Sequence, residues 1–161
     1  MQERTEPSVS DSLQMRFAPQ SRCFGCGPRN EAGLHLLSYA EDRLVVANWV
    51  PDRRHESFDN ILNGGICSTL LDCQATWAAA WHLYQQRELQ AWPCVVTASL
   101  RLVFLRPTRT DRPVRLEARA TASKGGQVTI EATLQVEDRA TVTCSGSFVA
   151  VAPGHPAYHR W

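Results

Sequence analysis

A carboxylate inside an apolar stretch is the feature of this sequence that points most directly to chemistry. Asp72 lies in the apolar run 66–73 and follows Asn63 by nine positions. An ionised carboxylate in surroundings of low dielectric constant costs several kcal/mol of folding free energy unless it is paired or put to use. Asp72 is therefore the first candidate for a catalytic group.

The segment Asn63-Gly64-Gly65 has the features of a helix start that binds an anion or a carbonyl oxygen. Asn63 is a natural N-cap, because its side-chain oxygen can accept hydrogen bonds from the first turn. Glycines behind a cap cost about 1 kcal/mol each relative to alanine, which indicates that bare backbone is needed there. The unpaired N–H groups of the helix start could polarise a carbonyl while Asp72 activates the attacking group.

The spacing of these residues predicts a dimer. Nine residues of helix separate Asn63 from Asp72 by about 13 Å along the helix axis, so one helix cannot bring both to the same reacting atom. The carboxylate must then come from a second chain whose helix runs antiparallel to the first. A two-fold homodimer supplies that arrangement twice, and pairing of two dimers into a homotetramer is left open.

A narrow polar stripe accompanies Asp72 along the predicted helix. Gly65, Ser68 or Thr69, and Thr76 fall on the same side of the helix as Asp72. We expect this stripe to line a substrate-binding cleft. The alternative is that the asparagine only caps the helix, the glycines allow tight packing and the aspartate is a paired core residue.

The elements that must position these residues follow from the hydrophobic periodicity. Apolar residues at spacings of three and four predict one helix from Gly64 to about Gln86. Two β-rich runs, 34–39 and 44–50, fit a hairpin, and period-two alternation predicts four more strands. Those strands lie within 96–104, 114–122, 128–136 and 142–150. The fold class is α+β, with an antiparallel sheet of about six strands wrapped around one long central helix.

Length and composition indicate one domain without a nucleic-acid or membrane role. The chain has 161 residues, with a flexible lead-in expected at 1–21, the domain at 22–152 and a tail at 153–161. Seventeen Lys and Arg against sixteen Asp and Glu give a net charge of +1, without the clustered basic residues that bind nucleic acid. The N-terminus has no apolar stretch of the length of a signal peptide or membrane span, so we expect a cytoplasmic protein with reduced thiols.

Three segments share their patterns with a known family. Residues 62–72 resemble a signature of His-Gly-Gly followed by apolar and small residues and then Asp or Glu, with Asn63 at the histidine position. Residues 97–107 resemble a strand that ends in an aromatic residue, a variable pair and proline. Residues 23–34 match a Cys-x-x-Cys-Gly-x-x-Asn-x-x-Gly-Leu opening. Over about 22–152 the chain thus resembles hotdog-fold thioesterases of the phenylacetic-acid (PaaI-like) type.

The resemblance implies a thioester hydrolase (EC 3.1.2.-) that acts on an acyl-CoA or acyl-carrier-protein thioester and needs no cofactor or metal. By that resemblance Asp72 is the general base or nucleophile, Gly64 or Gly65 donates the oxyanion N–H, and the Thr97 hydroxyl helps to place the water. Asn63 stands where most members have histidine, and an amide cannot titrate near neutral pH. Either that histidine is dispensable or the activity is weakened.

Other side chains are weaker substrate-binding candidates. His55 precedes the helix and could enter the cleft, although a lone loop histidine can also be simply solvated. Trp81 could wall an acyl pocket or belong to the core. Arg106 and Lys124 could bind the phosphates of coenzyme A or remain in solvent.

The pair Cys23 and Cys26 invites a zinc or redox interpretation. A structural zinc site needs four ligands, and no second Cys-x-x-Cys is present. Redox-active Cys-x-x-Cys pairs normally lie on a helix that follows a strand, whereas this pair lies in a glycine-rich lead-in. We therefore expect a loop packed against the sheet, with Cys73 behaving as a small hydrophobic residue.

Two functions remain as alternatives to hydrolysis. Asn63 is compatible with a protein that binds acyl thioesters without cleaving them. A hotdog hydratase or dehydratase is less favoured, because it would be expected to place a catalytic histidine beside its carboxylate.

Overall fold

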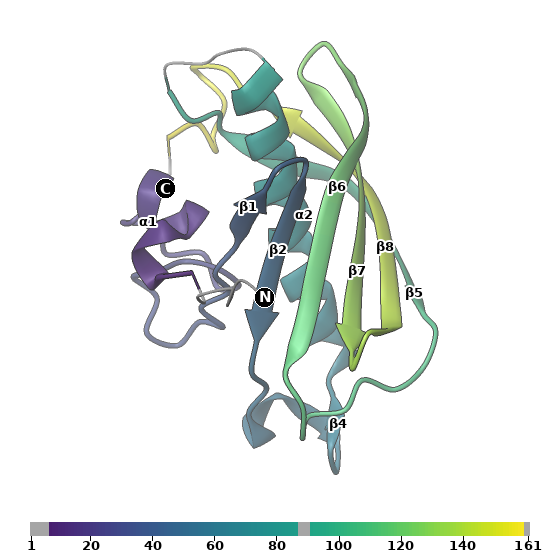
Figure 1. Cartoon of the computed structure of the whole chain (residues 1–161). Helices are drawn as coiled ribbons and strands as arrows, with labels where there is room; N and C mark the ends of the chain where they lie inside the picture. Colours follow the sequence, from purple (N-terminus) through teal and green to yellow (C-terminus); the bar gives the residue numbers. More distant parts are fainter. Residues whose placement is uncertain (1–6, 87–90, 160–161) are drawn as a thin grey trace, which may run out of the picture.

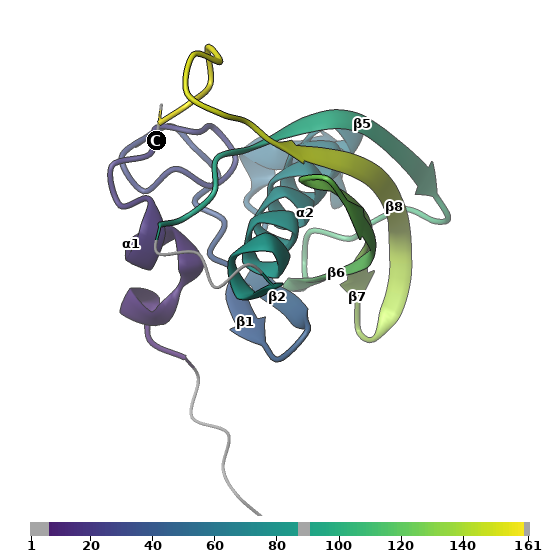
Figure 2. The ribbon, with the colours of Figure 1, turned by 90° about the horizontal axis from the view of Figure 1, so that it is seen from above.

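A six-stranded antiparallel sheet curves around one long helix, α2 (Gly64–Gln86) (Figure 1, Figure 2). The computed structural model describes residues 7–86 and 91–159, so the first six residues of the lead-in predicted at 1–21 and the last two of the tail predicted at 153–161 lie outside the described residues. The strand order is β1-β2-β6-β7-β8-β5. The strands are β1 (Tyr39–Glu41), β2 (Leu44–Trp49), β5 (Val95–Phe104), β6 (Val114–Lys124), β7 (Gln127–Val136) and β8 (Arg139–Ala150). The predicted α+β arrangement is confirmed.

Helix α2 begins where its cap predicts and is enclosed on several sides. The Asn63 carbonyl accepts the first intrahelical hydrogen bond from the N–H of Cys67 at 3.0 Å. Leu70, Leu71 and Leu83 of the helix are at most 1% exposed, and the sheet covers one side of it. A helix that is apolar around most of its circumference is stable only when neighbouring segments bury it.

The predicted first strand at 34–39 is mostly wrong. Only Tyr39–Glu41 pairs with β2. His35 has a φ of +53°, which an extended strand cannot accommodate. The N–H groups of Leu34 and Leu36 donate instead to the carbonyls of Phe24 and Gly25, at 2.8 and 3.0 Å. The segment therefore stabilises the preceding cysteine loop.

Strand β5 contains a bulge that changes which residues face the helix. Thr97 pairs with Phe148 and Ser99 pairs with Ser147, so Ala98 is an extra residue in the ladder. Sequence alternation predicted a single inward face of even-numbered residues from 96 to 104. The extra residue reverses which side chains face the helix: before the bulge the odd-numbered Thr97 faces α2, and only beyond the bulge do the even-numbered residues face it.

The segment 7–21, part of the flexible lead-in that we expected at 1–21, packs against the rest of the fold. It forms a short 3-10 helix, η1 (Val9–Asp11), and the helix α1 (Leu13–Phe17), and Leu13 is fully buried. The buried Gln14 side chain exchanges hydrogen bonds with Ser38, at 2.8 and 3.0 Å. Ser38 in turn donates to Gln74 of α2 at 2.8 Å. These side chains fix the segment against the side of α2 that the sheet leaves open (Figure 2).

Smaller elements surround the start of α2. A 3-10 turn, η2 (Arg53–His55), leads into a two-stranded hairpin of β3 (Glu56–Phe58) and β4 (Ile61–Leu62). Residues 151–159 form only turns, as the prolines predicted. Among the described residues, no helix has the length and apolar character needed to cross a membrane.

Candidate functional site

Asp72 is held in place by a hydroxyl from the neighbouring strand. Thr97 Oγ1 of β5 donates to Asp72 Oδ1 at 2.7 Å, a contact that depends on the β5 bulge. Burial raises the pKa of the half-buried Asp72 carboxyl above its usual value, and the nearby Cys23 adds to this increase. The hydrogen bond from Thr97 lowers the pKa and so partly opposes the burial. Such a carboxylate can accept a proton more readily than an exposed one.

The surroundings of Asp72 are of low polarity. Burial raises the pKa of the Cys144 thiol, on β8, to about 11, and the charge of Asp72 contributes to the same increase. Electrostatic effects are stronger in such surroundings than in water. The Asp72 charge therefore acts on groups on both neighbouring strands.

The cap at the start of α2 leaves one amide for a ligand. Asn63 Oδ1 accepts hydrogen bonds from the N–H groups of Gly65 at 2.7 Å and Ile66 at 3.3 Å. These bonds occupy two of the three N–H groups that precede the first intrahelical hydrogen bond. The Gly64 N–H makes no hydrogen bond within the described residues. Of the two glycines that sequence reasoning proposed, Gly64 is the one whose N–H has no hydrogen-bond partner within the described residues.

Phe104 covers the start of the helix. A Cβ atom added to Gly64 would lie 3.4 Å from the Phe104 ring, and the Phe104 side chain remains 55% exposed. Phe58, in the adjacent hairpin, is 76% exposed. The exposed Phe104 ring therefore borders the predicted carbonyl site.

The three hydroxyls of the predicted polar stripe bond to their own helix. Ser68 donates to the Gly64 carbonyl at 2.8 Å, and Thr69 donates to the Gly65 carbonyl at 2.9 Å. Thr76 donates to the carbonyl of Asp72 at 2.9 Å. Because their hydrogen atoms are engaged, these side chains can offer a substrate only acceptor oxygen atoms.

His55 lies next to the cap in space. Its backbone carbonyl accepts from the Asn63 N–H at 2.9 Å, and its Nδ1 accepts from the Asp52 N–H at 3.0 Å. Burial, and then the charge of Arg54, lower the pKa of His55 below its usual value. A neutral ring that accepts at Nδ1 carries its proton on Nε2, so His55 can donate one hydrogen bond beside the helix start.

The remaining candidates lie further from Asp72. Trp81 lines a hollow of about 320 Å³ with Arg43 and His82 near the end of α2, and its indole donates to the Asp42 carbonyl at 3.3 Å. Arg106 follows β5 near the start of α2 and donates to the Ala140 carbonyl at 2.7 Å. Lys124 is exposed at the tip of the β6–β7 hairpin, at the opposite end of the sheet. These three side chains do not converge within one chain.

The family follows from the sequence match to this region. The sequence profile of the thioesterase superfamily matches residues 59–143, which is more than half of the chain. This chain belongs to the thioesterase superfamily. The matched region contains both the start of α2 and the Asp72–Thr97 pair.

Solved structures share the fold of this thioesterase-superfamily chain at low sequence identity. A thioesterase superfamily protein from Shewanella loihica PV-4 is 24% identical, with a TM-score of 0.61, 73% of this chain and 91% of that chain covered. The PaaI protein of the Escherichia coli phenylacetic acid degradation operon is 12% identical, with a TM-score of 0.63 and coverage of 74% and 81%. A Haemophilus influenzae thioesterase is 16% identical, with a TM-score of 0.65 and coverage of 76% and 84%. These likenesses confirm the hotdog fold; a search of curated proteins finds no match.

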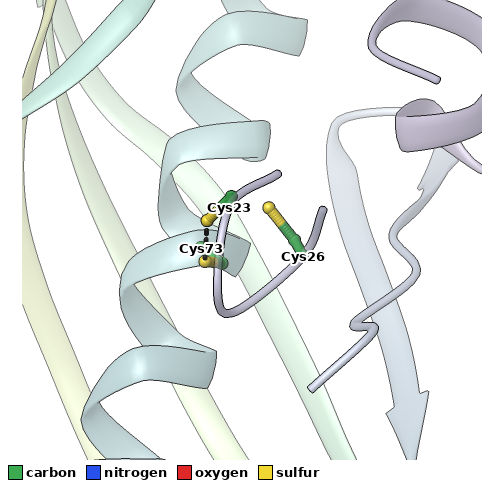
Figure 3. Close-up of side chains that lie close together, drawn as sticks. All are labelled: Cys23, Cys26 and Cys73. Atoms are coloured by element: carbon green, nitrogen blue, oxygen red, sulfur yellow. Dashed lines mark hydrogen bonds between the residues drawn. The ribbon is translucent and has the colours of Figure 1, made fainter. Parts of the chain in front are cut away.

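Sequence reasoning missed the partner of the Cys23–Cys26 loop in this superfamily member. The loop packs against α2, whereas we expected it to pack against the sheet. Cys73, expected to act as a small hydrophobic residue, brings its Sγ to 3.7 Å from that of Cys23 (Figure 3). The sequence feature that could have indicated this contact is the third cysteine, which directly follows Asp72 in the apolar run.

Proposed function

We propose that this protein hydrolyses an acyl thioester, of coenzyme A or an acyl carrier protein, at a site shared between two copies of the chain. The observation that carries the proposal is the half-buried Asp72 carboxylate, which Thr97 orients and whose pKa burial raises. Membership of the thioesterase superfamily supports the reaction class. The amide of Gly64, which has no hydrogen-bond partner within the described residues, supports the second component of the site.

The proposed reaction needs one proton acceptor and one oxyanion donor. Asp72 takes a proton from water, and the oxygen of that water attacks the thioester carbonyl carbon. The Gly64 N–H stabilises the negative charge that develops on the carbonyl oxygen. The carbon–sulfur bond then breaks, and Asp72 returns its proton to the departing thiolate, so the products are a free acid and a thiol. In a variant of this route the Asp72 carboxylate attacks the carbonyl carbon directly and expels the thiolate, forming a mixed anhydride; water then hydrolyses the anhydride to the acid, and its proton goes to the thiolate.

The distance along α2 supports a shared site. Gly64 and Asp72 are eight residues apart, which is about 12 Å along a helix axis, whereas a reacting carbonyl must lie within hydrogen-bond reach of both groups. If α2 of a second copy ran antiparallel to the first, its Asp72 would lie beside Gly64 of the first copy, and a two-fold dimer would contain two such sites. The exposed Phe104 side chain beside Gly64 is a suitable surface for that second copy to cover.

Asn63 takes a structural role in this proposal. Its oxygen caps the helix, and its amide Nδ2 makes no hydrogen bond within the described residues, so it can donate to the substrate. Proton transfer then rests on Asp72 alone. His55 Nε2 and Arg106, which both lie near the helix start, are proposed to contact the carrier portion of the substrate, and Lys124 would contact it only from another chain.

Thiol release from short, medium and aromatic acyl-CoAs tests the proposal. The wild-type protein should release free thiol from at least one of them, and Asp72→Ala should reduce kcat by about 10²–10⁴, the usual contribution of a general base. Glu131→Ala, which removes an exposed carboxylate on β7 that pairs with Arg119, serves as the matched control and should retain activity. Equal, slow thiol release by wild type and Asp72→Ala, with both binding the thioester, would identify a binding protein and refute the enzyme.

A further inference from the structure

Three cysteine thiols meet on one side of α2. Cys23 and Cys26 come from the N-terminal loop and Cys73 comes from the helix, and Figure 3 shows their sulfur atoms turned toward one another. The three Sγ atoms all lie within 4.8 Å of one another. Cys26 and Cys73 are buried, and Cys23 is half-buried. Two segments that are distant in sequence thus bring three potential ligands together.

We propose that Cys23, Cys26 and Cys73 form a binding site for one thiophilic metal ion, with Zn²⁺ as the expected occupant. A tetrahedral zinc with Zn–S bonds of about 2.3 Å holds its sulfur atoms about 3.8 Å apart. The Sγ atoms of Cys23 and Cys73 are 3.7 Å apart, which matches that spacing. Since all three lie within 4.8 Å, the remaining separations need to close by about 1 Å at most.

The loop is built to bring its thiols to the helix. A Cβ atom at Gly25 would lie 2.4 Å from Cys73 Sγ and 3.0 Å from a methyl carbon of Thr69, so only glycine allows this approach. The Gly27 N–H donates to the Cys23 carbonyl at 2.8 Å and closes the turn between the two loop cysteines. This turn directs both side chains to the same side.

The helix also supplies a hydrogen bond to the sulfur of a loop cysteine. Trp77 Nε1 donates to Cys26 Sγ at 3.2 Å. Donors to a ligating sulfur orient it and reduce its excess negative charge, as they do around metal-bound thiolates. This contact would be retained when the ion binds.

A metal ion accounts for the cluster better than a disulfide does. A disulfide requires sulfur atoms about 2 Å apart and would leave one of the three thiols unused. Thiolate ligands select ions such as Zn²⁺ and Cu⁺ over Mg²⁺ and Ca²⁺. Three protein ligands leave a fourth position for water or a small thiol, on the side of Cys23, which is the more exposed of the three. The ion would join the loop to α2 at the residue after Asp72.

Metal titration of the full-length, reduced and chelator-treated protein tests this inference without any assay of activity. Zn²⁺ competed against a chromophoric chelator should bind at one equivalent, and Co²⁺ should give sulfur-to-metal charge-transfer absorption. Cys23→Ser should weaken binding by at least about 100-fold, since the loss of a ligand exceeds the effect of an outer-shell partner. Cu⁺ should compete with Zn²⁺, whereas Mg²⁺ should not.

Cys144→Ser is the matched control, because Cys144 is as buried as Cys26, at 4% against 3% exposed, and lies outside the cluster. Its metal binding should equal that of the wild type. Alkylation of the wild-type protein gives a readout independent of any variant, as Zn²⁺ should protect Cys23, Cys26 and Cys73 from iodoacetamide. Absence of zinc binding, unchanged binding in Cys23→Ser, or a Cys23–Cys73 disulfide in freshly isolated metal-free protein would each overturn the proposal.

Discussion

At Asp72 two effects of opposite sign set the pKa of one carboxyl group. Burial disfavours the charged form and raises the pKa, whereas the hydrogen bond from Thr97 favours the charged form and lowers it. The net result is a pKa above the usual value, so the Asp72 carboxylate accepts a proton more readily than an exposed one, which suits a general base. Removing either effect should change the pH dependence of the reaction in a predictable direction.

Replacement of Thr97 by valine should move the acid limb of the activity profile. Without the hydroxyl the Asp72 pKa rises further, so the active carboxylate is lost at a higher pH as the pH falls. Profiles of kcat/KM against pH for wild type and Thr97→Val measure the shift. Thr97→Ser keeps the hydroxyl and should keep the wild-type limb; an unshifted Thr97→Val profile would mean that Thr97 does not act on Asp72.

At the scale of elements, the start of α2 combines a cap with a free amide. Asn63 engages the amides of Gly65 and Ile66, and Gly64 lies at the first position of the helix. Proline is tolerated at that position because its fixed φ suits the helix and because the N–H it lacks has no helical partner. A proline at position 64 can therefore remove the N–H donor of Gly64 while the helix stays intact.

Gly64→Pro should lower kcat by about 10²–10³, the usual effect of removing one oxyanion donor. Gly64→Ala keeps the N–H and should retain most of the activity, with its methyl group lying against the Phe104 ring. Far-UV circular dichroism of both variants verifies that α2 is intact. Equal activity of the two variants would exclude the Gly64 amide as the donor.

Sequence predicted the elements that depend on local patterns. The cap at Asn63 and the periodicity of three and four gave α2 its observed bounds, and alternation located the last four strands to within a few residues. The bulge at Ala98 was not predictable, because it arises from the pairing of β5 with β8. The same holds for Cys73, whose partners lie fifty residues away in the chain. Local sequence patterns therefore predict the helices and strands, whereas tertiary packing determines which side chains contact one another.

At the scale of the whole molecule, the proposed dimer predicts complementation between two inactive variants. A mixed dimer of Asp72→Ala and Gly64→Pro chains contains one doubly defective site and one intact site. Equal mixing after unfolding and refolding should therefore restore about one quarter of the wild-type activity, from half mixed dimers with one working site each. If native mass spectrometry finds mixed dimers but the mixture is no more active than its parents, each site lies within one chain.

The sheet order also governs when this molecule can fold during synthesis. β5 pairs in the sheet with β8, and β8 is the last strand among the described residues, so β5 leaves the ribosome well before its partner is synthesised. Likewise, the buried hydrogen-bond chain from Gln14 through Ser38 to Gln74 cannot be completed until Gln74 has been synthesised. A nascent chain that ends before about residue 140 should therefore expose the apolar sides of α2, and chaperones should bind it until β8 is made.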